Sequence, residues 1–205
     1  MLVKLKGKIF YWGLRSQYLT WRIQIQGREH LDQLYTDKKR FLLCFWHGKY
    51  IPIFPLLEGY EACVVSSQSK RGSIITEICR NFGFQSTQIP DQPRRDSLKL
   101  FNKILTEVHA TATAVDGPLG PPGRVKTGVI KMASAHNLVL LPVSVTSRWK
   151  IVLAKRWDRM EIPLPFTQIF MDFGEPVTVP LHIGAIEAKN FAKVLARTID
   201  NLAHS

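Results

Sequence analysis

The chain has 205 residues, of which 45% are hydrophobic, and its formal charge at pH 7 is +12. Such a length and composition predict one globular domain with a substantial core. No stretch has the roughly 20 mostly apolar residues that a transmembrane helix needs, and the apolar run 9–14 is too short for a signal peptide. The excess of basic residues indicates a polyanionic partner, either nucleic acid, an anionic membrane face or phosphorylated substrates.

Residues 1–22 combine basic and aromatic side chains, and no acidic residue precedes Glu29. We expect a helix with two distinct faces. One carries Leu2, Leu5, Ile9, Trp12 and Leu19, and another carries Lys4, Lys8, Arg15 and Arg22. This pattern is typical of an amphipathic helix in a membrane interface, with Lys4, Lys8, Trp12 and Arg15 as expected contacts. The alternative is an amphipathic helix that packs on its own domain.

The stretch 41–46 is short, apolar and rich in aromatics, and it predicts a buried strand. His47 follows directly, and Gly48 allows the backbone to turn. In open α/β sheets, ligands bind just beyond the carboxyl ends of the strands, where a histidine can act as a general base. The alternative is a histidine that merely ends a strand and is satisfied by a backbone carbonyl.

Strands and helices alternate through the rest of the chain, which predicts an α/β fold with a mostly parallel central sheet flanked by helices. We expect further strands at 21–26, 61–66, 84–89, 111–115, 138–145, 151–157 and 168–173. We expect helices at 29–35, 73–82, 98–108, 127–136 and 184–202, with a short or kinked one within 50–57.

The segment 116–126 is rich in glycine and proline and predicts a loop after the strand at 111–115. Asp116 opens it, at the same predicted sheet edge as His47. Backbone N–H groups at Gly117 and Gly120, together with Arg124 and Lys126, are expected to cradle a phosphate or an oxyanion. The alternative is a stiff turn with no ligand. The three cysteines lack metal-ligand spacing and predict free thiols in a reducing compartment.

Several motifs together resemble the glycerolipid acyltransferase superfamily, and most closely its small bacterial branch labelled domain of unknown function 374. They are Phe45-Trp-His-Gly48, Asp116-Gly-Pro-Leu-Gly-Pro121, Val125-Lys-Thr-Gly128, Leu141-Pro-Val143, Trp157-Asp-Arg159 through Phe166, and Gly174-Glu-Pro176. The resemblance covers nearly the whole chain. We expect one structural domain overall, made of the amphipathic membrane-interface helix at 1–22 and an acyltransferase-like α/β domain at 23–205.

The resemblance implies an enzyme of phospholipid biosynthesis that transfers a fatty acyl group from acyl-CoA or acyl carrier protein to a hydroxyl of a lysophospholipid-like acceptor. His47 would be the general base, and Gly48, Lys49 and the glycine loop would stabilise the oxyanion. The resemblance assigns Arg94 or Arg95 to the phosphate of the acceptor. It implies no metal and no prosthetic group, and a peripheral location on the cytoplasmic side of the membrane.

One departure from the superfamily concerns the residue that orients the histidine. The usual motif is His-x4-Asp, but Pro52 stands at the position of the aspartate. Asp116, from the neighbouring strand, is our candidate for that role. Two other functions remain open: a non-catalytic module of this fold that binds anionic lipid, and a nucleic-acid binder. The latter rests on net charge alone, because no nucleic-acid motif is present, and we expect no nucleic-acid partner.

Overall fold

The computed structural model describes residues 2–90 and 95–203. Its helices are α1 (Leu2–Tyr18), α2 (Arg28–Thr36), α3 (Ile53–Leu56), α4 (Lys70–Asn81), α5 (Arg95–Glu107), α6 (Thr127–His136) and α7 (Ala185–Leu202), with a 3₁₀ turn η1 at His47–Lys49. Its strands are β1 (Arg22–Gln26), β2 (Phe41–Phe45), β3 (Cys63–Ser67), β4 (Gln85–Ile89), β5 (Ala110–Ala114), β6 (Val139–Ser147), β7 (Lys150–Val152), β8 (Glu161–Pro163), β9 (Gln168–Phe173) and β10 (Val177–Thr178).

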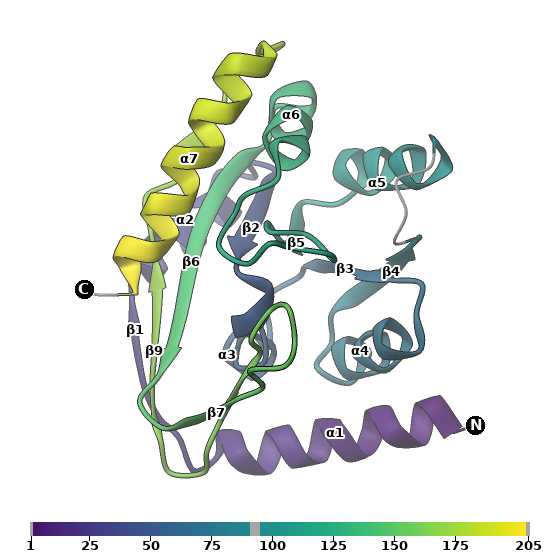
Figure 1. The fold of residues 1–205 in the computed structure, drawn as a ribbon, viewed down its shortest axis with the longest axis vertical. Helices are drawn as coiled ribbons and strands as arrows, with labels where there is room; N and C mark the ends of the chain where they lie inside the picture. Colours follow the sequence, from purple (N-terminus) through teal and green to yellow (C-terminus); the bar gives the residue numbers. More distant parts are fainter. Residues whose placement is uncertain (1, 91–94, 204–205) are drawn as a thin grey trace.

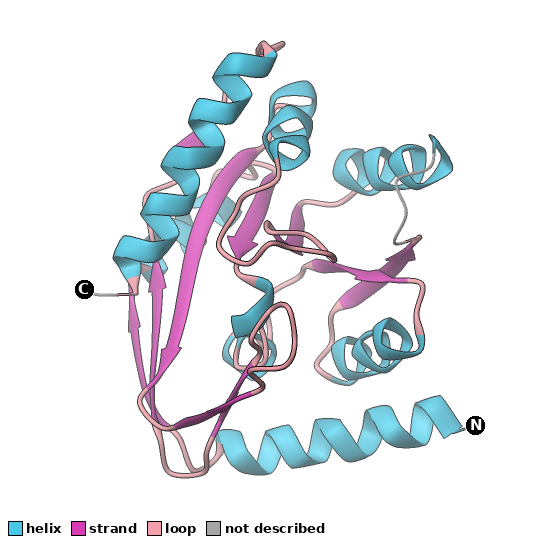
Figure 2. Cartoon of the chain, in the orientation of Figure 1, coloured by secondary structure: helices cyan, strands magenta, loops and turns pink. Residues whose placement is uncertain are grey.

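The main sheet has the strand order β1-β9-β6-β2-β5-β3-β4, with β10 added beside β6 (Figure 1). The pairs β6–β2, β2–β5, β5–β3, β3–β4 and β1–β9 are parallel, whereas β6–β9 and β10–β6 are antiparallel. Helices cover the sheet on both sides (Figure 2). The predicted α/β fold with a mostly parallel sheet is confirmed, and β7 and β8 form a separate antiparallel hairpin.

Strand β2 is buried on both faces, which explains its continuous apolar sequence. Because successive side chains of a strand point to opposite faces, the strand divides its residues between two hydrophobic cores. Phe41, Leu43 and Phe45 join the core that also holds residues of α1 to α4, and Leu42, Cys44 and Trp46 join the core of α5, α6 and α7. The strand is therefore fixed in register, and His47 emerges from its end at a defined position.

Helix α1 packs on α4 through its smallest residue. Gly7 is buried so closely that a Cβ there would lie 2.4 Å from the Cβ of Glu77. Tyr11 continues this contact edge-on against Phe82, with 4.7 Å between ring centroids. The apolar residues that predicted the amphipathic face point elsewhere, since Leu2, Leu5, Ile9 and Trp12 are 56–64% exposed. Among the helices in the described part of the chain, none has the length and apolarity to cross a membrane.

The predicted strand at 151–157 is wrong, because β7 ends at Val152 and residues 153–160 form turns. The polar sequence Lys155-Arg156 interrupts the apolar run, and Leu153 N–H donates to the Met160 carbonyl to close the hairpin β7–β8. The helix expected from 73 begins earlier, at Lys70, because the Ser69 side chain accepts a hydrogen bond from Gly72 N–H as its N-cap.

Candidate active site

A pocket of about 300 Å³ lies beyond the carboxyl ends of β2 and β5. Its lining residues are Trp46, Gly48, Lys49, Asp116, Pro122, Gly123, Val152, Asp158, Arg159, Glu161 and Asp200. They come from the strand ends, the glycine loop, the β7–β8 hairpin and the end of α7. The side chain of His47, at the same strand end, is 27% exposed. The parallel sheet thus brings the segments that begin at His47 and at Asp116 together at one edge, as expected for this topology.

The imidazole of His47 is held by Asp158, a residue of the hairpin turn. The Nδ1 atom lies 2.8 Å from Asp158 Oδ2, and the Asp158 side chain is completely buried. Arg156 clamps the same carboxylate with two hydrogen bonds, from Nε to Oδ1 at 2.8 Å and from Nη2 to Oδ2 at 2.7 Å. A bidentate guanidinium fixes a carboxylate in both position and plane, so the imidazole is oriented by a partner that cannot rotate.

The protonation states follow from these contacts. Burial raises the pKa of Asp158, but the hydrogen bonds from Arg156 and His47 outweigh this effect and leave the pKa below its ordinary value. An ionised carboxylate only accepts hydrogen bonds, so Nδ1 of His47 carries a hydrogen. In the neutral imidazole, Nε2 is then the acceptor, and it makes no hydrogen bond to the described residues. This is the tautomer that a general base requires.

Asp116 lies next to His47, but it does not orient the imidazole as we expected. Its Oδ1 accepts a hydrogen bond from the backbone N–H of His47 at 3.0 Å, because β2 and β5 run side by side and deliver a backbone amide to that position. Its Oδ2 is buried and has no hydrogen-bond partner within the described residues. Burial raises the pKa of Asp116, and the bond from His47 N–H only partly offsets this. The orienting role belongs to Asp158.

Two glycines allow the hairpin turn to approach the histidine. A Cβ on Gly48 would lie 2.2 Å from the Asp158 carbonyl oxygen. A Cβ on Gly120 would lie 2.5 Å from the Trp157 ring, and Gly120 also has φ +66°. Trp157 in turn lies beside the His47 ring, with 5.0 Å between centroids, and Tyr50 stands edge-on at 5.5 Å. The glycine loop therefore supports the aromatic wall around the imidazole.

The other predicted loop donors are placed less favourably for binding an anion. Gly117 N–H donates to the Ala114 carbonyl, and Lys126 Nζ donates to the Gly120 carbonyl, so both are used inside the loop. Arg124 is exposed at the surface. Lys49 does line the pocket, and Arg159 joins it as a cation that the sequence analysis did not assign.

The predicted acceptor-phosphate residues cannot be placed. Arg94 lies outside the described residues, and Arg95 begins α5 with its side chain outside them. Of the expected membrane contacts, Lys4, Lys8 and Trp12 are exposed on α1, whereas Arg15 is paired with Glu58. Within the described residues, no group of histidine, cysteine and acidic side chains is arranged to hold a metal ion.

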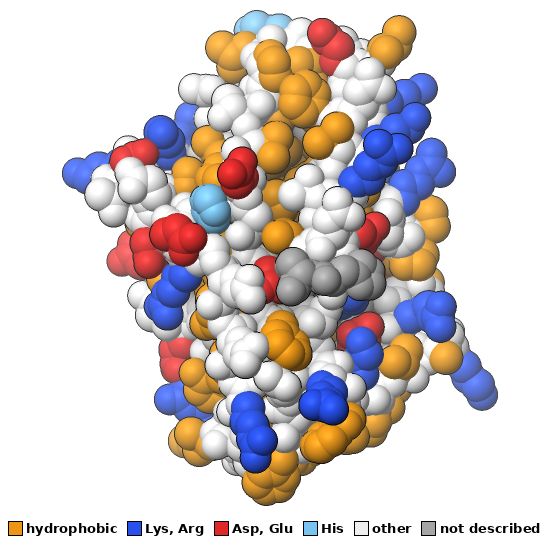
Figure 3. Space-filling model, turned by 90° about the vertical axis from the view of Figure 1, so that its left-hand side faces the viewer, with side chains coloured by type: hydrophobic (Ala, Val, Ile, Leu, Met, Phe, Trp, Pro, Cys, Tyr) orange, Lys and Arg blue, Asp and Glu red, His pale blue; other side chains and the backbone are white. Residues whose placement is uncertain are grey.

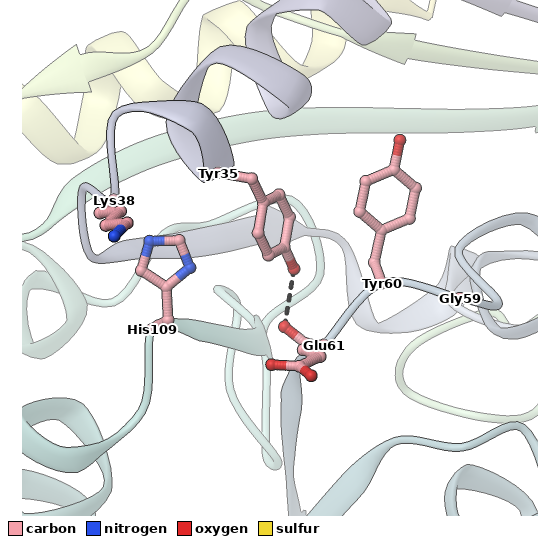
Figure 4. Close-up of a pocket in the computed structure, with 6 residues that line it drawn as sticks. All are labelled: Tyr35, Lys38, Gly59, Tyr60, Glu61 and His109. Carbon is pink, nitrogen blue, oxygen red and sulfur yellow. Dashed lines mark hydrogen bonds between the residues drawn. The ribbon is translucent and has the colours of Figure 1, made fainter.

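A second pocket, of about 420 Å³, lies at the opposite edge of the sheet (Figure 4). Its lining residues are Tyr35, Lys38, Gly59, Tyr60, Glu61 and His109, which precede β2, β3 and β5. The His109 ring packs at a tilt against Tyr35 with 5.2 Å between ring centroids, and its buried Nε2 has no partner among the described residues. No described carboxylate bonds this imidazole, so the chemistry of an oriented base is found at His47.

Asp158 and Arg156 are the functional candidates that sequence reasoning missed. Asp158 lies within the block Trp157-Asp-Arg159 that carries part of the family resemblance, and Arg156 directly precedes that block. The predicted strand at 151–157 includes Arg156 and ends just before Asp158, so it would have kept the chain extended there. Only the turn at 153–160 places the Asp158 carboxylate against the His47 imidazole and the Arg156 guanidinium against that carboxylate.

Comparisons with known proteins agree with this fold. No protein-family model matches the chain. An uncharacterised protein of Rickettsia prowazekii (strain Madrid E) is 25% identical over 176 residues, which are 83% of this chain and 79% of that protein. Among solved structures, the 1-acyl-sn-glycerophosphate (LPA) acyltransferase PlsC from Thermotoga maritima matches with a TM-score of 0.61 and 18% identity. That match covers 99% of this chain and 79% of the other. At this identity, the likeness shows a shared fold.

Proposed function

We propose that this protein is an acyltransferase that moves a fatty acyl group from a thioester donor to a hydroxyl of a lysophospholipid-like acceptor. The observation that carries the proposal is the His47–Asp158 pair, an oriented imidazole beside a pocket at the carboxyl edge of the sheet. The fold shared with an LPA acyltransferase and the motifs of the glycerolipid acyltransferase superfamily support the same reaction.

In this reaction, Nε2 of His47 takes the proton of the acceptor hydroxyl as its oxygen attacks the thioester carbonyl carbon. The tetrahedral intermediate then expels the thiolate, which recovers the proton from the imidazolium, and an ester is formed. Asp158 stabilises the transient imidazolium while keeping Nδ1–H in place. General-base assistance of this kind is worth about 10²–10⁴-fold in rate. Lys49 and Arg159, at the pocket wall, are the cations available for the oxyanion or for an acceptor phosphate.

We further propose that the enzyme works on the surface of an anionic membrane, with α1 lying in the interface. Leu2, Leu5, Ile9 and Trp12 are exposed on α1, and Lys4 and Lys8 are exposed beside them. A basic residue near an anionic bilayer contributes about 1 kcal/mol of attraction. Acceptors that reside in the membrane would then reach the pocket without entering bulk water.

The experiment is transfer of a radiolabelled acyl group to lysophosphatidate, with acyl-CoA and acyl carrier protein as separate donors. We expect His47→Ala to lower the rate by at least about 10²-fold. The matched control is His182→Ala, which removes an exposed histidine in the turn before α7 and should leave the rate unchanged. Full activity in His47→Ala would rule out the proposed base. Vesicle binding without turnover from either donor would instead favour the non-catalytic lipid-binding module.

A further inference from the structure

A cluster of large apolar side chains stands exposed where α1 meets the base of the β7–β8 hairpin. Its members are Leu19, Trp149, Leu164 and Phe166, which we call the base patch. They are 76%, 56%, 36% and 70% exposed. They come from three segments of the chain: the turn after α1, the turn between β6 and β7, and the loop between β8 and β9. Clusters of exposed apolar residues on a soluble domain mark interaction sites.

The backbone beneath the base patch is tightly hydrogen-bonded. Phe166 N–H donates to Thr20 Oγ1 at 2.9 Å, and Trp21 Nε1 donates to the Leu164 carbonyl at 3.1 Å. Trp149 N–H donates to Thr167 Oγ1 at 2.8 Å, and Leu164 N–H to the Trp149 carbonyl at 3.0 Å. These bonds join all three segments, so the apolar side chains are held outward by a fixed scaffold.

Phe166 adopts a backbone conformation that its side chain does not favour. Its φ is +60°, in the left-handed region where Asn, Asp and Gly are the usual residues. An exposed phenylalanine in that conformation contributes little to folding, since the residue is 70% exposed and its backbone is strained. Strain of this kind that the surrounding structure maintains is a reason to look for function at the residue.

The loops that carry the base patch lie at the end of the molecule where α1 ends (Figure 1). The loops that lead into β7 and β9 are at the lower end of the molecule, next to the C-terminal end of that helix. Figure 3 shows hydrophobic side chains gathered at this lower end, with basic side chains close by. Arg148 lies over the Trp149 ring at 5.9 Å, and no acidic residue occurs in 1–28. An apolar surface with aromatic rings and a basic surround complements the interface of an anionic bilayer.

We propose that the base patch inserts into the interfacial region of an anionic phospholipid bilayer, together with the exposed face of α1. This proposal rests on the membrane-bound acyltransferase proposed above and identifies a second membrane contact for it. The consequence concerns the active site. The hairpin whose base carries Trp149 and Leu164 carries Asp158 and Arg156 in its turn, so the element that orients His47 is itself seated on the bilayer.

The test is cosedimentation of the full chain with vesicles of equal parts phosphatidylcholine and phosphatidylglycerol. We expect Phe166→Asn with Leu164→Ser to weaken binding by at least about tenfold, because an aromatic and an aliphatic anchor are lost. Asparagine tolerates φ +60°, so Phe166→Asn alone should melt no lower than the parent. The matched control is Ile186→Ser, which removes an apolar side chain that is 76% exposed on α7, away from the base patch.

Unchanged vesicle binding in the paired variant, or an equal loss in Ile186→Ser, would overturn the proposal. A second assay separates it from the proposed function: acyl transfer between a short-chain thioester and a water-soluble acceptor, without vesicles. We expect the paired variant to keep the parent rate there, because neither substituted residue lines the pocket. If the parent is inactive with every donor while the paired variant still loses vesicle binding, the proposed function fails and the base patch stands.

Discussion

The Nδ1 atom of His47 and the Oδ2 atom of Asp158 lie 2.8 Å apart, although 111 residues separate them in the chain. His47 ends a central parallel strand, and Asp158 lies in the turn of a hairpin outside the main sheet. Arg156 fixes the carboxylate, and Gly48 gives the turn the space to approach. An acid–base pair assembled from such separate elements depends on the hairpin staying closed over the strand end.

Replacing Asp158 by Asn removes the charge that orients the imidazole. We expect the acyl-transfer kcat to fall by about 10²–10⁴-fold with little change in KM, because the base loses its fixed tautomer while the pocket keeps its shape. Steady-state kinetics with saturating donor measures this. Asp37→Asn is the control, since Asp37 pairs with Lys39 at the surface before β2, at the opposite edge of the sheet from the site. An unaltered kcat in Asp158→Asn would contradict the assigned role.

Gly120 and Gly123 form a matched pair for testing the support of Trp157. Both have positive φ, at +66° and +70°, but only at Gly120 would a Cβ meet the Trp157 ring. Gly123→Ala should cost about 1–2 kcal/mol in unfolding free energy from the backbone alone. Gly120→Ala should cost about 1–3 kcal/mol more from the steric clash, and should also lower the transfer rate by displacing Trp157 from His47. Denaturant unfolding and steady-state kinetics on both variants check this. Equal losses of unfolding free energy and of transfer rate in the two variants would argue against the proposed support of Trp157 by Gly120.

Asp116 predicts a pH dependence of stability with a defined sign. Burial raises its pKa above the ordinary 3.8, so the folded protein holds this proton more tightly than the unfolded chain does. Its contribution to stability therefore falls as pH rises from about 3.8 through the raised pKa, and stays lower above it. Asp116→Asn removes this pH-dependent loss of stability, and its side-chain oxygen can still accept the hydrogen bond from His47 N–H.

We therefore expect Asp116→Asn to be at least as stable as the parent at neutral pH, with the advantage shrinking as the pH falls toward 3.8. Asp116→Ala, which leaves His47 N–H without its acceptor, should lose about 1–3 kcal/mol. Urea unfolding of the three proteins across this pH range measures both effects. An advantage of Asn over Asp that grows toward acidic pH would contradict the sign.

Gly7 and Gly13 test how α1 is seated on the domain. At Gly7 a Cβ would lie 2.4 Å from Glu77 Cβ, whereas at Gly13 nothing lies within 4 Å. Gly13→Ala should raise the free energy of unfolding by about 0.5–1 kcal/mol, as alanine favours a helix interior. Gly7→Ala should lower it, because the clash with α4 outweighs the same propensity gain. Thermal melts of both variants check the opposite signs, and stabilisation by both would show that α1 is not seated as described.

The sequence alone determined most of the secondary structure and the class of fold. The apolar run of β2, the helical periodicity of α6 and α7 and the glycine-proline loop at 116–126 are local patterns whose physical causes act within a few residues. They predicted α6 at 127–136 and β9 at 168–173 with the observed bounds. They also placed His47 and Asp116 at the same sheet edge, because the ends of parallel strands meet there.

The tertiary structure decided which partner orients His47 and which face of α1 is exposed. Asp158 reaches the imidazole only because the chain turns at 153–160, where local apolarity favoured a strand, and because the missing side chain of Gly48 admits that turn. The apolar stripe of α1 is compatible with both packing and a membrane. The contact of Gly7 with α4 settles its orientation, since close packing is optimised over the whole domain and not within one helix.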